Sequence, residues 1–511
     1  MKNSMVSFGT SLLSGLVTLG VTLATTSLLL TGCDLAPKFK LPSFKVGNAY
    51  KESSPIDHSS KIDKPEDGNW TKATAPEQLA IPADWWTLFD DIHLMCLIEE
   101  ANDKNPTIKA AKEHVEQARS QVRIASSAFF PAIDAGASPS RRLSSAASQK
   151  QFNPNPVVKP YTLYNAQGTI SYDFDIFGQN RNNKAFESFK LASSQATLDA
   201  IRLTLQADIA HYYYTLRALT AEQAILKQSL TGKEQALELI QQKRDLGAVG
   251  DLDVSRYESD LALTKADAFA IQQQIEQTEH ALAVLTGKLP NELSLMVEPL
   301  VDAPPVVPAG LPSELLQRRP DILAAQKDMA AANQHIGAVR ASFFPHISLS
   351  ALGGFESSEL GDLFKWSSRT WLLGPLVGTT LSIPIFKGGE GLASLAMSKS
   401  SFRESVEIYR QKVLTAFQEV EDQLSANRSL TLQQEQLADA LKASLTADSI
   451  AKQRYDSGGI SYIERLDAEQ VMLNTKRRSI QTLGQHYINT IQLIRALGGG
   501  WKPSQDEKKA E

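Results

Sequence analysis

An internal duplication constrains what this chain can fold into more than any other feature. Pro106 recurs as Pro320 and Pro131 as Pro345, and both pairs are separated by the same number of residues (320 − 106 = 214 and 345 − 131 = 214). The match runs without a gap and includes the pairs Ile108/Ile322, Ala110/Ala324, Ala111/Ala325, Ala118/Ala332, Phe129/Phe343, Phe130/Phe344 and Ile133/Ile347. A duplication of this size predicts two copies of one architecture within the chain.

Each copy changes from a helical to a strand pattern at the same place. In the first copy, every even position from Tyr164 to Ile176 is apolar or glycine and every odd position is polar, which is typical of a strand with one apolar face. The pattern predicts a β-hairpin over about 132–177, and the second copy predicts another over about 346–386. The chain thus offers four strands of the length found in transmembrane barrels.

Two helical segments are too long for an ordinary globular domain. Neither the stretch between Gly178 and Gly247 nor the one between Gly389 and Gly458 contains a proline, and each could reach roughly 100 Å at about 1.5 Å per residue. A glycine-containing turn and a return helix follow each segment. We therefore expect each copy to consist of a helix, a hairpin, a long helix and a return helix.

The resulting organisation has six parts. We predict a signal peptide, an extended arm, a first repeat, a Pro-rich linker, a second repeat and a charged tail, over residues 1–32, 33–83, 84–300, 301–318, 319–500 and 501–511.

The N-terminal segment indicates export and lipid attachment. An apolar run from Leu12 to Leu30 ends in Thr31-Gly32-Cys33, which looks like a bacterial lipobox, so Cys33 would be the mature N-terminus and would carry diacylglycerol and N-acyl lipid, including palmitate. A transmembrane helix is the alternative, since the run is just long enough to span. The second cysteine, Cys96, has no partner for an internal disulfide, and we expect it on a buried helix face.

Composition and motifs argue against several other functions. The net charge is −5 and no Lys/Arg cluster is present, which makes nucleic-acid binding an unsuitable role. We find no phosphate loop, no His-Glu-x-x-His motif and no paired-cysteine metal motif, and the eight histidines are dispersed. We therefore predict neither an enzyme nor a metal or cofactor site.

Four strands cannot close a membrane barrel alone, because the smallest barrels need about eight and open edges cannot lie in lipid. Three chains that contribute four strands each would give an even-numbered barrel, which predicts a homotrimer. The polar face of the second strand would then line a water-filled interior, through Asn165, Gln167, Thr169, Ser171, Asp173 and Asp175. A soluble β-sandwich with one wet face is the alternative.

The aromatic junctions belong to the same prediction. Aromatic residues suit the membrane interface, and proline is tolerated as the first residue of a strand. We expect the two junctions to mark that interface, through Phe129, Phe130, Pro131, Phe343, Phe344 and Pro345. Contact with the core at a helix end is the alternative for each phenylalanine.

Several motifs resemble the outer membrane factor family, the TolC-like efflux channels, and more closely its lipoprotein branch of OprM-type and NodT-type proteins. The motifs are Gly310-Leu311-Pro312-Ser313-Glu314-Leu315-Leu316-Gln317-Arg318-Arg319-Pro320-Asp321-Ile322, Ala341-Ser342-Phe343-Phe344-Pro345, Tyr172-Asp173-Phe174-Asp175-Ile176-Phe177-Gly178 and Ala496-Leu497-Gly498-Gly499-Gly500-Trp501. The resemblance implies an α+β membrane protein: a homotrimer with a twelve-stranded outer-membrane β-barrel and a long α-helical periplasmic barrel. It also implies a passive efflux conduit, lipid-anchored in the outer membrane, that works with a periplasmic adaptor and an inner-membrane pump of the resistance-nodulation-division type.

The resemblance also implies a periplasmic gate at the turns far from the barrel. By position in the family's motif, Ile463 would form an apolar constriction, Asp467 and Glu464 an acidic one, and Asp253 an added acidic ring. Three copies of each carboxylate around one axis would attract cations and repel one another. Local capping is the alternative: Ser461 and Glu464 fit a capping box, and Asp251 fits the cap of the first return helix.

Competing functions share parts of this pattern. A periplasmic coiled-coil adaptor or scaffold lipoprotein would share the signal and the long helices but would not need four amphipathic strands. Type I secretion and metal-ion efflux use similar channels. Asp34, directly after Cys33, leaves sorting to the outer membrane open.

Overall fold

The computed structural model describes residues 35–44, 50–53, 81–143, 145, 159–300, 302–307, 312–373 and 379–501. The predicted signal peptide, Cys33 and residues 502–511 of the predicted tail lie outside these ranges.

The chain divides into two compact units, and each unit draws on both sequence repeats. The strand unit comprises Met1–Pro42, Glu116–Ser193 and Ala325–Tyr409. The helical unit comprises Ser43–Val115, Ser194–Ala324 and Arg410–Glu511.

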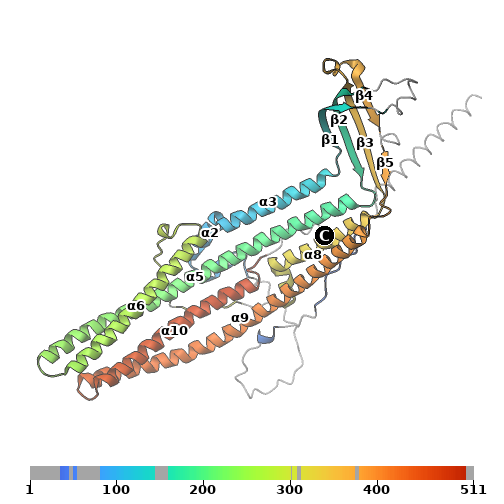
Figure 1. Cartoon of the computed structure of the whole chain (residues 1–511). Helices are drawn as coiled ribbons and strands as arrows, with labels where there is room; N and C mark the ends of the chain where they lie inside the picture. Colours follow the sequence, from blue (N-terminus) through green and yellow to red (C-terminus); the bar gives the residue numbers. More distant parts are fainter. Residues whose placement is uncertain are drawn as a thin grey trace, which may run out of the picture. The chain divides into compact units, whose positions relative to one another are not determined.

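The strand unit contains one antiparallel sheet (Figure 1). Its strands are β1 (Ala132–Arg142), β2 (Tyr161–Phe174), β3 (His346–Ser357), β4 (Arg369–Leu373) and β5 (Thr379–Ser382). The order is β1-β2-β3-β4, and β5 also pairs with β3. Both predicted hairpins are therefore present, and strands from the two copies meet at the β2–β3 pair.

The register places apolar side chains in rows across the sheet. Ile133 lies opposite Ile170, which lies opposite Ala351, which lies opposite Leu373. Ile133 is 72% exposed and Ile170 is 45% exposed. Because residues of one parity share a face, the sheet presents an apolar face to its surroundings, as the alternation predicts.

The second hairpin is less regular than predicted. Its return half is described as two short strands, β4 and β5, on either side of residues 374–378, which lie outside the described ranges. The connection from β3 contains two short 3-10 helices, η5 (Leu360–Asp362) and η6 (Trp366–Ser368).

The prediction that Asp175 lines the wet face of the sheet is wrong. Strand β2 ends at Phe174, and the Asp175 carboxylate accepts hydrogen bonds from the backbone amides of Asn180 and Arg181, both at 2.9 Å. Its side chain is 12% exposed. The first amides of a helix have no partner within the helix, and this carboxylate takes the capping role for α5.

The two aromatic junctions have the same backbone geometry. Helix α3 (Pro106–Ser127) and helix α8 (Pro320–Ala341) each have 22 residues and end just before a Phe pair. In each copy both Phe amides donate to carbonyls three residues back. Phe130 is 72% exposed and Phe344 is 41% exposed, and Phe344 stacks on Phe177 with ring centroids 4.8 Å apart. The proposed interface role stays a prediction.

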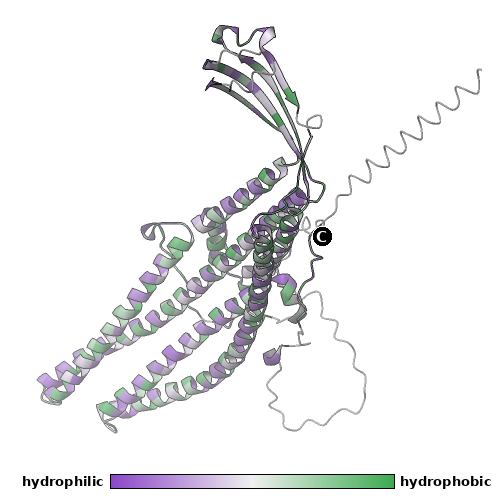
Figure 2. Ribbon diagram, turned by 45° about the vertical axis from the view of Figure 1, so that its right-hand side comes forward, coloured by the Kyte–Doolittle hydropathy of each residue, from purple (hydrophilic) through white to green (hydrophobic). Residues whose placement is uncertain are grey.

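The long helices repeat in length. Helices α5 (Gln179–Asp245) and α9 (Glu390–Asp456) each have 67 residues, and the return helices α6 (Asp251–Leu285) and α10 (Tyr462–Ala496) each have 35. Apolar and polar residues alternate around them (Figure 2), which is typical of helices that bury one face. Among the described residues, no helix combines the length and the apolar character needed to cross a membrane.

The core of the helical unit lies where the first repeat meets α10. Trp85, in η3 (Trp85–Phe89), is fully buried, and the Tyr214 and Tyr487 rings stack with centroids 4.4 Å apart. The short helices η1 (Lys51–Ser53), η4 (Pro290–Glu292) and α7 (Pro312–Arg318) complete the element order.

Helix α2 (Ile92–Lys104) precedes α3, and Asn105 separates the two helices. Asn105 is 4% exposed, and its Oδ1 accepts from the amides of Thr107 and Ile108. The prediction that Cys96 is buried is wrong, because Leu94, Leu97, Ile98 and Ala101 form the buried face of α2 and Cys96 is exposed.

Candidate functional site

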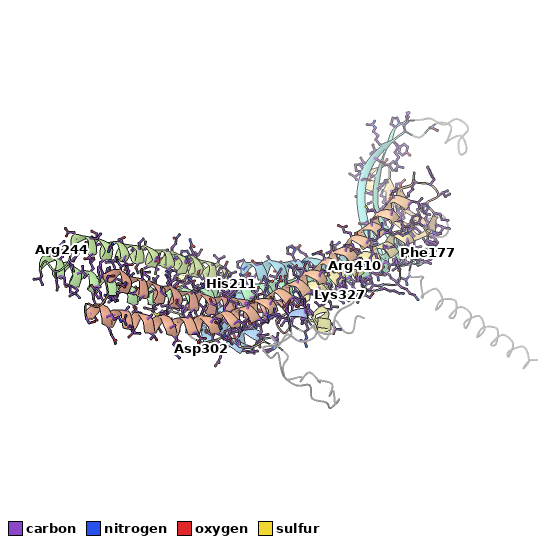
Figure 3. All side chains as sticks on the ribbon, turned by 90° about the horizontal axis from the view of Figure 1, so that it is seen from below. Phe177, His211, Arg244, Asp302, Lys327 and Arg410 are labelled. Carbon is purple, nitrogen blue, oxygen red and sulfur yellow. The ribbon has the colours of Figure 1, made fainter. Side chains whose placement is uncertain are left out.

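The two hairpin turns of the helical unit have one design. Gly247 (φ 78°) ends α5 and Gly458 (φ 76°) ends α9. In each turn two successive amides donate back to carbonyls of the last helical turn, at 2.7 to 2.9 Å. This is the glycine-terminated helix end in which a positive φ is free of Cβ strain. Arg244, labelled in Figure 3, marks the α5 side of the first turn.

The predicted gate residues lie directly after these turns. Asp253 is half-buried in the first turn of α6, whereas Asp467 is exposed on α10. Ile463 is 43% exposed in the first turn of α10. Neither carboxylate has a salt bridge among the described residues. Their positions near both turns fit the predicted constriction. The predicted aperture would form where three such chains surround one axis.

Local capping explains Glu464. Its carboxylate accepts from the Ser461 amide at 2.8 Å, and the Glu464 amide donates to Ser461 Oγ at 3.3 Å, so the predicted capping box is confirmed. The hydrogen bonds from the Ser461 backbone and hydroxyl hold the pKa of Glu464 below its usual value. The corresponding prediction for Asp251 is wrong, because Gly250 occupies the cap position and Asp251 begins α6.

Three tyrosines join the two hairpins just behind the turns. Tyr257 on α6 stacks on Tyr462 of α10 with ring centroids 3.6 Å apart, and Tyr455 of α9 lies 6.2 Å from Tyr462. Burial, and then a hydrogen bond with Tyr455, raises the pKa of the Tyr257 hydroxyl. The Arg465 guanidinium lies 5.3 Å from the Tyr455 ring centroid. The cluster therefore couples both repeats beside the candidate gate.

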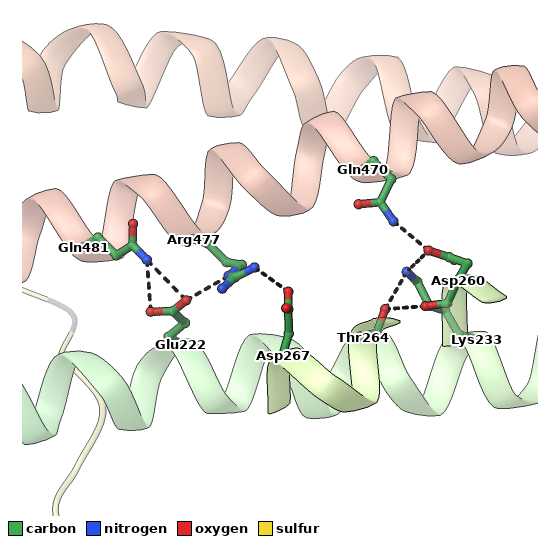
Figure 4. Close-up of polar contacts among 8 residues, drawn as sticks. All are labelled: Glu222, Lys233, Asp260, Thr264, Asp267, Gln470, Arg477 and Gln481. Carbon is green, nitrogen blue, oxygen red and sulfur yellow. Dashed lines mark hydrogen bonds and ion pairs between the residues drawn. The ribbon is translucent and has the colours of Figure 1, made fainter. Parts of the chain in front are cut away.

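Farther from the turns, Arg477 of α10 bridges the first repeat (Figure 4). Its Nε donates to Glu222 of α5 at 2.8 Å and its Nη1 to Asp267 of α6 at 3.0 Å. Gln481 also donates to both carboxylate oxygens of Glu222, at 3.2 Å each. Glu222 is 3% exposed, so these bonds compensate the burial of its charge.

A second polar group lies closer to the turns (Figure 4). Lys233 of α5 donates to Asp260 of α6 at 2.8 Å and to Thr264 Oγ1 at 2.9 Å. Gln470 of α10 donates to the same Asp260 oxygen at 2.8 Å. Lys233 is 5% exposed, and its stem and charge are enclosed between helices of the first repeat.

These cross-repeat contacts were missed in the sequence. Glu222 pairs with Arg477 across 255 residues, and no local spacing links such residues. The only available signal in the sequence was a charged residue on the apolar face of a helix, where a buried charge needs a partner. Among the described residues, no group of three or more His, Cys, Asp or Glu side chains could hold a metal ion.

The Arg319 motif forms a separate buried network. Arg319 donates to Asp321 through Nε at 3.0 Å and Nη2 at 2.7 Å, to Glu419 of α9, and to the Ala496 carbonyl at 3.2 Å. These charged side chains line a small pocket together with Arg495. Burial opposes ionisation of Asp321, but the hydrogen bonds from Arg319 hold its pKa below the usual value.

The chain resembles known proteins along almost its whole length. The family model described as "Outer membrane efflux protein" matches residues 97–288 and 311–499. The probable efflux pump outer membrane protein TtgC of Pseudomonas putida is 31% identical over 94% of this chain and 95% of its own. The cation efflux system protein CusC of Escherichia coli is 30% identical over 93% of this chain and 97% of its own.

Solved structures give the same result. The CmeC outer membrane channel of Campylobacter jejuni superposes with a TM-score of 0.82 at 26% identity, over 94% of this chain and 97% of CmeC. The open-state MtrE outer membrane channel of Neisseria gonorrhoeae superposes with a TM-score of 0.76 at 27% identity, over 92% and 99%. The duplicated helix-to-strand design and the turn geometry common to both repeats agree with these similarities, and we conclude that the chain belongs to the outer membrane efflux protein family.

Proposed function

We propose that this protein is the outer-membrane channel of a tripartite efflux system, a passive conduit from the periplasm to the exterior. The observation that carries the proposal is the pairing, in each repeat, of an antiparallel hairpin with a 67-residue helix. The chain also matches channel structures over more than nine-tenths of its length.

Three chains would assemble the channel. Within the described residues, β1 pairs only with β2, and β4 and β5 pair only with β3, so both outer edges of the sheet are open. An open edge in lipid leaves backbone groups without partners, and closure into a barrel removes this penalty. Three four-stranded sheets then form a closed twelve-stranded barrel, with the Phe129-Phe130-Pro131 and Phe343-Phe344-Pro345 junctions at the membrane interface.

The partners follow from the class of system. A periplasmic adaptor and an inner-membrane pump of the resistance-nodulation-division type would supply the connection and the energy, and lipid on Cys33 would anchor the arm in the outer membrane. The relatives' names refer to toluene, antibiotics and cations. Relatives at this level of similarity are therefore named for chemically different substrates.

The gate lies, in this proposal, at the hairpin turns. Asp253 and Asp467 from three chains form acidic rings, and Ile463 forms the apolar constriction. We expect Asp253→Ala combined with Asp467→Ala to raise single-channel conductance in planar bilayers, because cations that the acidic rings would hold in the constriction are no longer retained there. Asp245→Ala, a change of an exposed carboxylate at the same turn, is the matched control. An unchanged conductance of the double variant would contradict the gate assignment.

A membrane fractionation distinguishes the channel from an adaptor lipoprotein. We expect detergent-resistant trimers that dissociate on heating, in the outer-membrane fraction. A soluble monomer after removal of residues 1–33 would contradict the channel proposal, because the proposal requires the open strand edges to pair with those of other chains in a barrel.

A further inference from the structure

Four helices bring charged side chains together immediately behind the candidate gate. Lys233 comes from α5, Asp260 from α6, Asp448 from α9 and Glu469 from α10. Lys233 pairs with Asp260, and Glu469 interacts electrostatically with Lys233, Asp260 and Asp448. Each long and each return helix of the chain thus contributes one charged group to the same place.

The single buried cation of this cluster is already committed to one carboxylate. Lys233 Nζ lies 2.8 Å from Asp260 Oδ1, and Gln470 donates to the same oxygen. Side-chain exposure is 6% for Lys233 and 11% for Asp260. The ion pair is therefore enclosed and hydrogen-bonded, which is the condition under which a buried pair is tolerated.

Glu469 lies beside this pair without a comparable partner. Its nearest cation is Arg465, one helical turn earlier, with Nη2 to Oε2 at 4.0 Å, which is longer than a hydrogen bond. The Arg465 guanidinium also lies over the Tyr455 ring. The Glu469 side chain is 23% exposed. An ionised Glu469 therefore adds a poorly compensated negative charge between four helices.

We propose that Glu469 is a proton-responsive group that sets how firmly α10 packs against the other three helices, directly behind the gate. When Glu469 is neutral, the charges that remain in the cluster are more nearly balanced and α10 packs closely. When Glu469 is ionised, it repels Asp260 and Asp448, and the packing of α10 loosens. The link to gating rests on the function proposed above, whereas the proton response itself does not.

The electrostatics give the direction of the response. Burial, opposed by Arg465 and Lys233 and reinforced by Asp448 and Asp260, raises the pKa of Glu469. A carboxyl group with a raised pKa binds its proton more tightly in the folded state than in the unfolded state. The contribution of this group to packing is then fully present below the unfolded pKa of 4.5 and is lost as the pH rises through the higher folded pKa. Arg465, Lys233, Asp448 and Asp260 are the four charged side chains that act on Glu469, one from each of the four helices.

The position of Glu469 connects the response to the gate residues. It follows Asp467 by two residues and Ile463 by six on the same helix. The intervening Arg465 and the stacked Tyr462 tie this first part of α10 to α6 and α9. Loosening at Glu469 therefore reaches the turn that presents Ile463 and Asp467.

Hydrogen exchange of the full chain in detergent tests the proposal. We expect amides of residues 462–470 to gain at least about threefold in protection, corrected for intrinsic rates, at about pH 5 relative to about pH 7.5. Glu469→Gln should give the higher protection at both pH values. Glu469→Asp, which keeps a titratable group, should retain a pH dependence. Glu435→Gln, a change of an exposed carboxylate on α9, is the matched control and should behave like the wild type.

Two results would overturn the inference: a wild-type protein with equal protection at both pH values, or a Glu469→Gln variant that keeps the wild-type response. Single-channel conductance separates the inference from the proposed gate. Exchange that follows Glu469 while conductance is unaffected at either pH would uphold the proton response and refute its role in gating.

Discussion

Replacement of Arg319 by methionine tests the reasoning about buried charge most directly. Arg319 is 8% exposed and holds Asp321, Glu419 and the Ala496 carbonyl. Removing one partner of a buried ion pair typically costs about 3–5 kcal/mol. The side chains of Asp321 and Glu419 are 28% and 35% exposed, so water can partly solvate the two carboxylates. We therefore expect the free energy of unfolding to fall by about 3 kcal/mol.

Thermal unfolding of the detergent-solubilised protein by circular dichroism measures the effect. The helical unit has roughly 300 residues, and the entropy of unfolding is ~2.1 cal/mol/K per residue. A loss of about 3 kcal/mol in the free energy of unfolding therefore lowers Tm by about 5 °C. Arg202→Met is the matched control, because Arg202 is 38% exposed and pairs with Asp199 on the surface. We expect the control to lie within about 0.5 kcal/mol of wild type.

The pH dependence supplies an independent check of the same network. The depressed pKa of Asp321 contributes stability that is present above the unfolded value of 3.8 and is lost as the pH falls through the lower folded value. Without Arg319, only the Ile322 amide and the Lys412 charge would oppose the effect of burial on this carboxyl group, and its protonated form would be favoured more. The difference between wild type and Arg319→Met should therefore shrink on acidification. A difference below about 1 kcal/mol at neutral pH would refute the reasoning.

Two further substitutions test local packing and capping. A Cβ atom on Gly484 of α10 would lie 2.7 Å from the Ala218 Cβ of α5, so Gly484→Val should destabilise the protein by about 1–3 kcal/mol in thermal unfolding. The control is Gly232→Ala, at a helical site with open space. This control should be neutral or should stabilise the protein by up to about 1 kcal/mol. Asp175→Ala should lose about 1 kcal/mol and speed hydrogen exchange in the first turn of α5, and Asp175→Asn, which keeps an acceptor, should lose less; equal exchange in both variants would contradict the capping role.

The elements of the fold could be predicted because their signals are local. Proline and glycine mark the ends of the long helices, and strict alternation marks β2. These local signals were sufficient to place the elements. Asp175 and Cys96 were misplaced for a related reason. Periodicity assigns a face to every residue, but Asp175 serves the following helix, and Cys96 lies one position outside the buried face of α2.

The contacts behind the candidate gate could not be predicted, because they depend on how distant helices cross. Gly484 allows α10 to approach α5 at Ala218, and this close approach brings Arg477 within reach of Glu222. A helical pattern shows which residues share a face, but it does not show the register between two helices that are hundreds of residues apart.

The duplication also explains why one position has two different chemistries. Asn105 and Arg319 correspond at the offset of 214 residues (319 − 105 = 214), and both are buried immediately before a proline that begins a helix. Asn105 Nδ2 donates to the carbonyl of Leu285, the last residue of α6, and Arg319 Nη1 donates to that of Ala496, the last residue of α10. The shared task is to satisfy the end of a return helix. Only the second copy adds a charge there, and the carboxylates of Asp321 and Glu419 gather around it. The two copies therefore share their architecture while the buried electrostatics at this position differ.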